Sequence, residues 1–547
     1  MKPNSHQIHR LDRTTNAAFE CLADSRWFVL LAPVIMCLLV GLSTPFDDVL
    51  REDAYNYLKT AMAIKYGDWS VPETQPMGWS VFLAAILRIL QVESIFGGML
   101  VARLVSITAV AATIFPLAGI ARVVVGGAGV VLVTLCFALN PILWFVGRSG
   151  SAESLFILLG MTSLYFFTTR PASIKNIIVT VTVAALAFHV RPQGLFLLGA
   201  ILVTLALVWV KNKKPYHKHM LVAVGCFFII VSPQLIARYV EFGSPFYFGE
   251  NSKYFVDDIS DVWAGNIPVP GLLQYLSTHT WPDYYEKFIE HGIFAVLKDF
   301  HFQLVLNFWI VLMYLGMAKI LLVDRKDNLI ALLAFLFIPL LSLTPVYDVF
   351  RSTRHLVSSI PIIYLVGAFG LRRSAGLQKL GVSGLITLIV LSATVYGRMP
   401  GISFTPQSTV SIPMVKDSWA VWAAMSLEGR VGIIEGGDLI DMSQHYMPID
   451  PDIIQTGVHL NLVKRPYNTV NSRIEYIRPG KLSSFDEALA EFRRNSIRYL
   501  VLDNVHIRRL PQLRKAFSPK YSHDLKLLKH FEGGETLRDV YIYEIKQ

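Results

Sequence analysis

Long apolar segments alternate with short polar ones over roughly the first 400 residues of the chain. A helix that crosses a bilayer needs roughly 20 predominantly apolar residues, and segments near that length recur from Trp27 to Gly397. The pattern predicts a polytopic α-helical membrane protein with about eleven spans. We place the spans at about 27–44, 96–120, 123–142, 152–168, 174–190, 194–210, 219–236, 301–323, 329–344, 356–371 and 380–397.

The apolar segment from Trp79 to Leu90 is too short for a span and carries Arg88 near its end. The charges of the later loops decide its place, because loops on the cytoplasmic side are enriched in Lys and Arg. If residues 79–90 crossed the membrane, every later basic cluster would face outward. The sequence therefore predicts an interfacial helix here, with the following basic clusters inside: around 122, 170–175, 211–218 and 372–373.

The same topology divides the chain into three regions. Residues 1–26 form a cytoplasmic N-terminal segment, residues 27–397 form the transmembrane domain, and residues 398–547 lie outside the cytoplasm. The outward-facing segments within the membrane domain are a first loop, a short turn and a large loop rich in acids and aromatics. They cover about 45–96, 140–152 and 236–300.

No span-length apolar segment follows Tyr396, so the C-terminal region is a separate domain by composition. Short apolar stretches with the period of a β-strand occur at 431–435, 499–503 and 540–545, and a helical pattern covers 484–494. These elements predict a small extracytoplasmic α/β domain. Long domains translocate largely regardless of their charge, so its basic residues do not oppose this location.

Composition supports the membrane class and excludes others. The chain of 547 residues is 53% hydrophobic and 16% charged, whereas soluble domains are about 25% charged. The net charge of +10 belongs largely to the inside loops, and no basic stripe with interleaved aromatics predicts nucleic-acid binding. The four cysteines lie in or beside apolar spans and form no CxxC pair. An external domain without disulfides fits an integral protein of a bacterial inner membrane.

The first outer loop holds a cluster of acids. The run Phe46-Asp-Asp-Val-Leu-Arg-Glu-Asp53 brings four carboxylates together at the predicted membrane surface. Such a cluster raises the pKa of its members unless a cation or a proton is shared, which suits a catalytic base or a cationic substrate. A solvated acidic loop is the alternative. A divalent ion would fit among these acids, but no metal-binding motif occurs and we expect no required metal.

Asp53 is followed by Tyr57 and Ala61, then by Gly67-Asp-Trp69 and a proline-containing segment that leads into an apolar helix. This order resembles the first outer loop of GT-C glycosyltransferases, in the group of protein O-mannosyltransferases and lipid A aminoarabinose transferases. The resemblance implies that Asp53 is the catalytic base, with Asp48 and Glu52 contacting substrate. Many members have Asp-Glu where this chain has Asp53-Ala54, so the pair Asp47-Asp48 remains an alternative base.

Later segments resemble the same family in the same order. The turn from Arg148 to Phe156 is similar to the second outer turn, which implies that Glu153 is a second site acid. The Arg191-Pro192 turn resembles one close to the donor phosphate, and Arg354-His355 resembles an Arg-Tyr pair. The structural alternatives to substrate binding are that these arginines reach toward lipid headgroups and that Glu153 stabilises the start of a helix. The predicted substrate-binding residues are Asp48, Glu52, Arg148, Glu153, Arg191, Tyr347, Arg354 and His355.

The resemblance implies an inverting glycosyltransferase that uses a polyprenyl-phosphate sugar as its donor. The acceptor would be a hydroxyl of a glycan, a lipid or a protein on the outer face of the membrane. A transporter or flippase of a lipid-linked saccharide is the main alternative. Transporters commonly place ionisable residues at the bilayer midplane, whereas the charges here gather at the ends of the spans. A membrane-tethered binding protein that works through its C-terminal domain is the third hypothesis.

Overall fold

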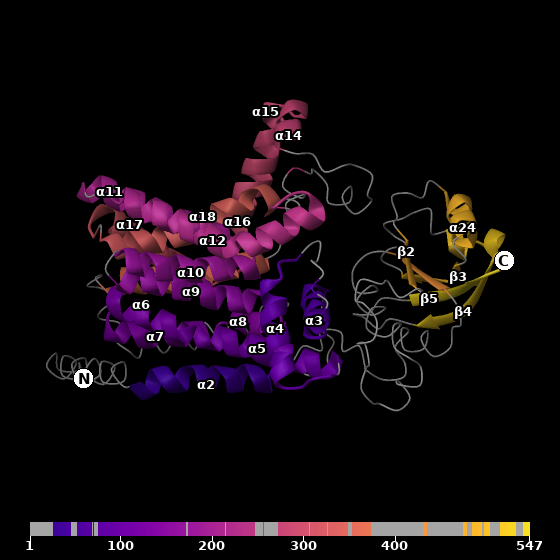
Figure 1. Ribbon diagram of the computed structural model, residues 1–547, viewed down its shortest axis with the longest axis horizontal. Helices are drawn as coiled ribbons and strands as arrows, with labels where there is room; N and C mark the ends of the chain where they lie inside the picture. The colour runs from indigo at the N-terminus through magenta and orange to yellow at the C-terminus, as the bar shows by residue number, and fades with distance from the viewer. Residues whose placement is uncertain are drawn as a thin grey trace, which may run out of the picture.

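The computed structural model covers the chain and describes a bundle of helices followed by a small sheet (Figure 1). The described residues are 26–44, 52–67, 69, 75–93, 95–170, 173–213, 215–246, 255, 272–305, 307–324, 326–347, 353–372, 430–434, 474–477, 484–494, 497–503, 515–531 and 540–546.

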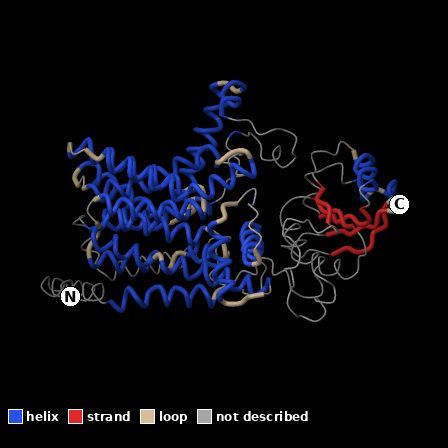
Figure 2. Tube along the Cα trace, viewed as in Figure 1, coloured by secondary structure: helices blue, strands red, loops and turns tan. Residues whose placement is uncertain are grey.

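The long helices of the bundle lie side by side and share one direction (Figures 1 and 2). They are α2 (Arg26–Leu42), α5 (Ile95–Ala112), α6 (Ile114–Val124), α7 (Gly127–Ala138), α9 (Glu153–Thr169), α10 (Ile174–Val190), α11 (Gly194–Asn212), α12 (His217–Phe242), α17 (Asn307–Leu322), α18 (Asp327–Tyr347) and α19 (Ile360–Arg372). The short helix α8 (Pro141–Arg148) follows α7 at an angle. The apolar side chains of these helices form one continuous core, and large side chains such as Ile229 and Val240 on α12 point outward. An apolar surface of this kind fits a lipid environment.

Four of the described helices are long and apolar enough to cross a membrane, at Gly97–Val124, Gly194–Asn212, His217–Phe242 and Asp327–Pro345. A fifth is added if α7 and α8, which are bent by 54°, count as one span. Six shorter apolar helices fall within other predicted spans or at the interfacial segment 79–90. The membrane class is therefore supported, and the count of about eleven spans stays a prediction. The predicted span 380–397 lies outside the described residues.

Asn140 produces the bend between α7 and α8. Its side-chain oxygen accepts from the backbone N–H groups of Ile142 and Leu143 at 2.9 and 3.3 Å, which starts a new helix. The indole of Trp144 donates to the carbonyl of Ala138 at 2.6 Å and so satisfies the end of α7. Because α8 is helical, the segment that the sequence analysis treats as a turn after Asn140 is a short helix followed by a tight loop.

Two helices from the first outer segment pack against each other and against the bundle. They are α3 (Glu52–Lys65) and α4 (Gly78–Ile89), and the hydroxyl of Ser80 donates to the carbonyl of Tyr57 at 2.9 Å. Trp79 is fully buried, so α4 is held by the protein on one side. A Cβ built at Gly78 would lie 2.4 Å from the carbonyl carbon of His189, so α4 touches the backbone near the end of α10.

We expect Gly78→Ala to weaken this contact, because the added methyl group overlaps the backbone of His189. Overpacking of this kind costs about 1–3 kcal/mol. The midpoint of thermal unfolding in detergent should fall. Gly225→Ala on α12 is the matched control, because a Cβ there meets nothing within 4 Å. Equal stability of the two variants would contradict the close approach of α4 and α10.

The segment that the sequence analysis treats as a large outer loop contains several helices. These are α14 (Leu272–Thr278), α15 (Trp281–Tyr284), the π-helix η2 (Tyr285–Phe294) and α16 (Ala295–Phe302), and we call them the arm. Thr280 starts α15 with a capping box, in which its backbone N–H donates to Asp283 Oδ2 at 2.7 Å. Its hydroxyl also donates to the same oxygen at 2.8 Å. These bonds hold the pKa of the Asp283 carboxyl below its ordinary value.

The C-terminal strands form one five-stranded sheet in the order β2-β1-β3-β5-β4. The strands are β1 (Arg430–Ile434), β2 (Ile474–Ile477), β3 (Ile497–Asp503), β4 (Leu525–Phe531) and β5 (Val540–Ile545). The pairs of β1 with β2 and β3 are parallel, and β5 is antiparallel to β3 and β4. Phe485, Leu489 and Phe492 of α24 (Phe485–Arg494) pack on the sheet. A small α/β unit is therefore present, and its place outside the cytoplasm stays a prediction.

Candidate functional site

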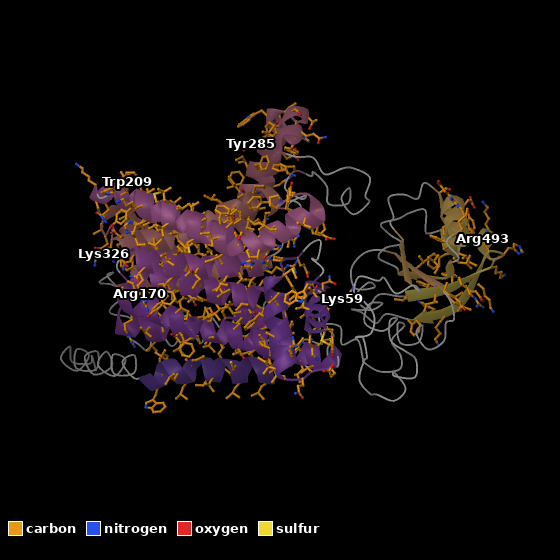
Figure 3. All side chains as sticks on the ribbon, viewed as in Figure 1. Lys59, Arg170, Trp209, Tyr285, Lys326 and Arg493 are labelled. Carbon is orange, nitrogen blue, oxygen red and sulfur yellow. The ribbon has the colours of Figure 1, made fainter. Side chains whose placement is uncertain are left out.

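The site is built at the end of the bundle where α9 begins and α10 ends. Arg170 and Lys326 lie at the opposite end of the bundle, and Lys59 of α3 lies near this one (Figure 3). The two ends therefore differ as the charge pattern predicts, with basic loop residues at one end and the candidate site at the other. We call the latter the site end.

Glu153 is the first residue of α9 and is 6% exposed. The loop that precedes it turns at Gly150, which has a φ of +69°, a conformation that favours glycine. The hydroxyl of Ser151 donates to the carboxylate, and a helix start favours a negative charge. Burial of a carboxylate is costly unless positive charges compensate it, so its partners decide what it does.

Arg191 is the main partner of Glu153. It follows the last residue of α10 and is 8% exposed, and its Nη1 forms an ion pair with Glu153 Oε1. Pro192 cannot continue the helix, which fixes the chain where the arginine turns inward. The Nε of Arg191 donates to Gln193 Oε1 at 3.2 Å, so the guanidinium is held from two sides.

The segment before α19 completes the cluster. Arg354 and His355 lie on a short 3-10 helix, Thr353–His355, and Arg191 Nη2 lies 3.1 Å from His355 Nδ1. Because a guanidinium only donates, Nδ1 accepts and the ring proton resides on Nε2 of a neutral histidine. The charge of Arg354 also acts on Glu153. Segments more than 160 residues apart in sequence thus meet at one point.

The cluster brings two guanidinium groups together beside one carboxylate. Glu153 and Arg191 are buried, and Arg354 and His355 are half-buried. Two arginines at one point match the geometry of a phosphate. The cluster of Glu153, Arg191, Arg354 and His355 is therefore suited to an anionic group.

The helix α3, whose first turn contains Asp53, is connected to the site end by backbone contacts. Asp53 lies one turn before Tyr57, whose carbonyl accepts from Ser80 near the start of α4. Gly78 at the start of α4 touches His189, two residues before Arg191. This chain of contacts brings α3 to the site end. The side chains of Glu52 and Asp53 are outside the description, as are Asp47 and Asp48 altogether.

Two predicted site residues have other partners. Arg148 Nη2 donates to Ser43 Oγ at 2.6 Å and lies over the ring of Trp144, which ties α8 to the end of α2. The hydroxyl of Tyr347 donates to Asp299 Oδ2 at 2.9 Å, and both residues are buried. These contacts join helices to one another, so any contact of Arg148 or Tyr347 with substrate stays a prediction.

Gln193, Ser151 and Asp299 take part in these contacts, although the sequence analysis assigns them no role. A role for Gln193 was predictable from the sequence, because it follows the Arg-Pro pair that the resemblance singles out. Asp299 had no local signal, since its partner Tyr347 is 48 residues away. Among the described residues no three His, Cys, Asp or Glu side chains form a metal site, and the acids of the first loop fall outside that search.

Comparison with protein-family models and with curated proteins finds no match, whereas solved structures do match. The crystal structure of ArnT from Cupriavidus metallidurans bound to undecaprenyl phosphate has a TM-score of 0.57 and 12% identity, over 95% of this chain and 98% of that one. Archaeoglobus fulgidus AglB, an oligosaccharyltransferase in complex with an inhibitory peptide and a dolichol-phosphate, has a TM-score of 0.54 and 12% identity, over 88% and 70%.

A third similar structure is the arabinofuranosyltransferase AftD from Mycobacteria, with a TM-score of 0.50 and 16% identity over 96% of this chain and 42% of that one. All three are GT-C glycosyltransferases. The chain therefore has the GT-C fold, and the resemblance drawn from its sequence is confirmed at the level of the fold.

Proposed function

We propose that the chain is a membrane glycosyltransferase that moves a sugar from a polyprenyl phosphate to an acceptor hydroxyl. The observation that carries the proposal is the meeting of Arg191 and Arg354 at the buried Glu153, beside His355, at the end of an apolar bundle. A polyprenyl-phosphate sugar joins a long apolar chain to an anionic group, and the bundle offers both environments. The similar structures bound to undecaprenyl phosphate and dolichol-phosphate support this donor.

In this proposal Arg191 and Arg354 bind the phosphate of the donor. The bond from the anomeric carbon to the phosphate oxygen breaks with its electron pair going to the phosphate, which gains negative charge. Fixed guanidinium groups stabilise that charge more strongly in the transition state than in the bound donor. Glu153 and Gln193 act as positioning residues, because their bonds to Arg191 hold its guanidinium in one orientation.

Asp53 is the proposed general base. It takes the proton of the acceptor hydroxyl while the acceptor oxygen bonds to the anomeric carbon. Attack on the face opposite the leaving phosphate inverts the configuration of that carbon. The products are the glycosylated acceptor, a polyprenyl phosphate and a protonated Asp53 that returns its proton to water. The acceptor is a glycan, lipid or protein hydroxyl outside the cytoplasm, and the proposed location is a bacterial inner membrane with residues 398–547 outside.

The binding of undecaprenyl phosphate to the purified protein tests the first half of the proposal. We expect Arg354→Gln to weaken binding roughly tenfold or more, because a hydrogen bond to a charged group contributes about 1.5–3 kcal/mol. Native mass spectrometry in detergent measures the bound fraction. Arg170→Gln is the matched control, since Arg170 lies at the opposite end of the bundle. Equal loss in both variants would contradict a phosphate site at Arg354.

Transfer in proteoliposomes tests the second half. Protein, radiolabelled polyprenyl-phosphate sugar and an envelope extract as acceptor should yield labelled product in the aqueous or lipid-glycan fraction. Donor that crosses the bilayer unchanged, without formation of product, would support a flippase and sink the transferase. Mass analysis of envelope glycans from cells with and without the protein then identifies the acceptor.

A further inference from the structure

The arm exposes large apolar side chains along its whole length. Trp281 is 75% exposed, Phe294 55% and Phe302 62%, and Tyr285 and Leu276 are about half exposed. The tip of the arm, with α14 and α15, stands away from the flank of the bundle and crosswise to the long helices, whereas α16 lies against the bundle (Figure 1). Tyr285 lies on the projecting part (Figure 3). An exposed set of this kind in a surface loop marks an interaction site.

The arm is a folded element, because aromatic rings close around its tip. Tyr275 is fully buried, and its ring stacks on His279 with centroids 3.9 Å apart. The ammonium of Lys287, on the π-helix, lies 5.5 Å from the centre of the same ring. The hydroxyl of Tyr284 donates to the carbonyl of Leu276 at 2.7 Å. These contacts fold α14 back on η2, so the exposed side chains keep fixed positions.

Two contacts join the arm to the bundle and fix its position along the long helices. His301 of α16 stacks on Tyr314 of α17, and His301 Nε2 lies 2.5 Å from the Tyr314 hydroxyl. Tyr314 is seven residues from the start of α17, which is about 10 Å along a helix. A Cβ at Gly292 would lie 2.6 Å from the carbonyl oxygen of Thr344, near the end of α18. The arm therefore contacts the bundle at two levels, near the end of α18 and about 10 Å along α17.

Neighbours of Tyr314 on α17 belong to the outward apolar surface of the bundle. Val311 is 57% exposed and Leu315 is 51% exposed. The exposed apolar surface thus continues from α17 through Tyr314 to Phe302 at the base of the arm. Because this surface is continuous, lipid that surrounds α17 also contacts the base of the arm.

The arm has an apolar line and an adjacent line that mixes charged and aromatic residues. Residues that follow one another at four-residue spacing along η2 and α16 form the apolar line: Tyr285, Ile289, Ile293 and Leu297. The adjacent line carries exposed charged residues at Glu286, Glu290 and Lys298, together with the exposed rings of Phe294 and Phe302. This pattern is that of a helix lying in a membrane interface, with tyrosine and tryptophan at the level of the headgroups.

We infer that the arm lies in the outer interface of the bilayer, parallel to the membrane plane, with its apolar line in the lipid. The partner is a surface of neutral or zwitterionic lipid, because the exposed charges of the arm are mainly acidic and an anionic surface would repel them. This inference needs a membrane but does not depend on sugar transfer. An arm in water would leave the proposed reaction untouched.

Spin labels test this placement. In the full chain without its native cysteines, Trp281→Cys, Tyr285→Cys and Glu286→Cys each receive a nitroxide label, in nanodiscs of phosphatidylethanolamine and phosphatidylcholine. Collision with oxygen reports lipid, and collision with a water-soluble nickel chelate reports water. The ratio of oxygen to nickel accessibility should be several-fold higher at 281 and 285 than at 286. Equal ratios at the three positions would overturn the inference.

A second measurement keeps the cysteines and covers the case in which the labelled chain does not fold. Brominated lipids quench tryptophan within the bilayer, so the protein should lose less fluorescence in the Trp281→Phe variant than in the original chain. Trp209→Phe, near the opposite end of the bundle, removes a different half-exposed tryptophan as a control. If Trp281→Phe leaves the quenched intensity unchanged, Trp281 is in water and the inference is wrong.

Discussion

Sugar transfer by Asp53→Asn is expected to fall by about 10²–10⁴-fold, the usual contribution of a positioned general base. An amide has nearly the shape of a carboxylate but takes no proton, so the acceptor hydroxyl would attack without assistance. Binding of undecaprenyl phosphate should stay close to that of the original chain, because the phosphate is assigned to Arg191 and Arg354. The measurements are initial rates of transfer in proteoliposomes and donor binding by native mass spectrometry.

Glu52→Gln and Asp48→Asn are the matched controls, because each removes one carboxylate of the same acidic run. Both should retain a larger share of the rate than Asp53→Asn. A full rate in Asp53→Asn, together with a large loss in Asp48→Asn or Asp47→Asn, would transfer the base role to the Asp47-Asp48 pair. The first outer segment would then still supply the base, from a position before α3.

The local sequence pattern predicts many of the helices and strands of this chain. The strand periods at 431–435, 499–503 and 540–545 match β1, β3 and β5, and the helical pattern at 484–494 matches α24. The lengths of the apolar segments predict the helices, and the basic clusters predict which helix ends lie on the same side. The meeting of Arg191, Arg354 and Glu153 confirms that their three segments reach one end of the bundle. That inference was possible because each span reverses the direction of the chain, so that alternate loops lie at the same end of the bundle.

Elements that depend on distant partners were not predictable in this way. The arm reads as an acidic loop, because its helices are short and are held by rings around Tyr275. The strand β4 has the pattern Leu-Lys-Leu-Leu-Lys-His-Phe, which does not alternate, and a register shift near Leu527 accounts for the interruption. The bend at Asn140 is set by side-chain capping inside an otherwise continuous apolar run.

Glu153→Leu or Arg191→Met alone is expected to lower the free energy of unfolding by about 3–5 kcal/mol, because each variant leaves a buried charge without its partner. The double variant Glu153→Leu with Arg191→Met removes both charges and keeps apolar volume. Its stability should return most of the way to that of the original chain, whereas its sugar transfer should remain at the background. Unfolding in detergent and transfer in proteoliposomes measure the two quantities.

This cycle separates the structural role of the ion pair from its role toward the donor. If the pair served only to hold α9 against α10, the double variant would recover transfer together with stability. If Arg191 binds the phosphate, transfer stays lost in a well-folded protein, because Arg354 alone does not supply two guanidinium groups. A double variant whose stability loss equals the sum of the two single losses would show that Glu153 and Arg191 are not coupled. That result would remove the buried ion pair on which the phosphate site depends.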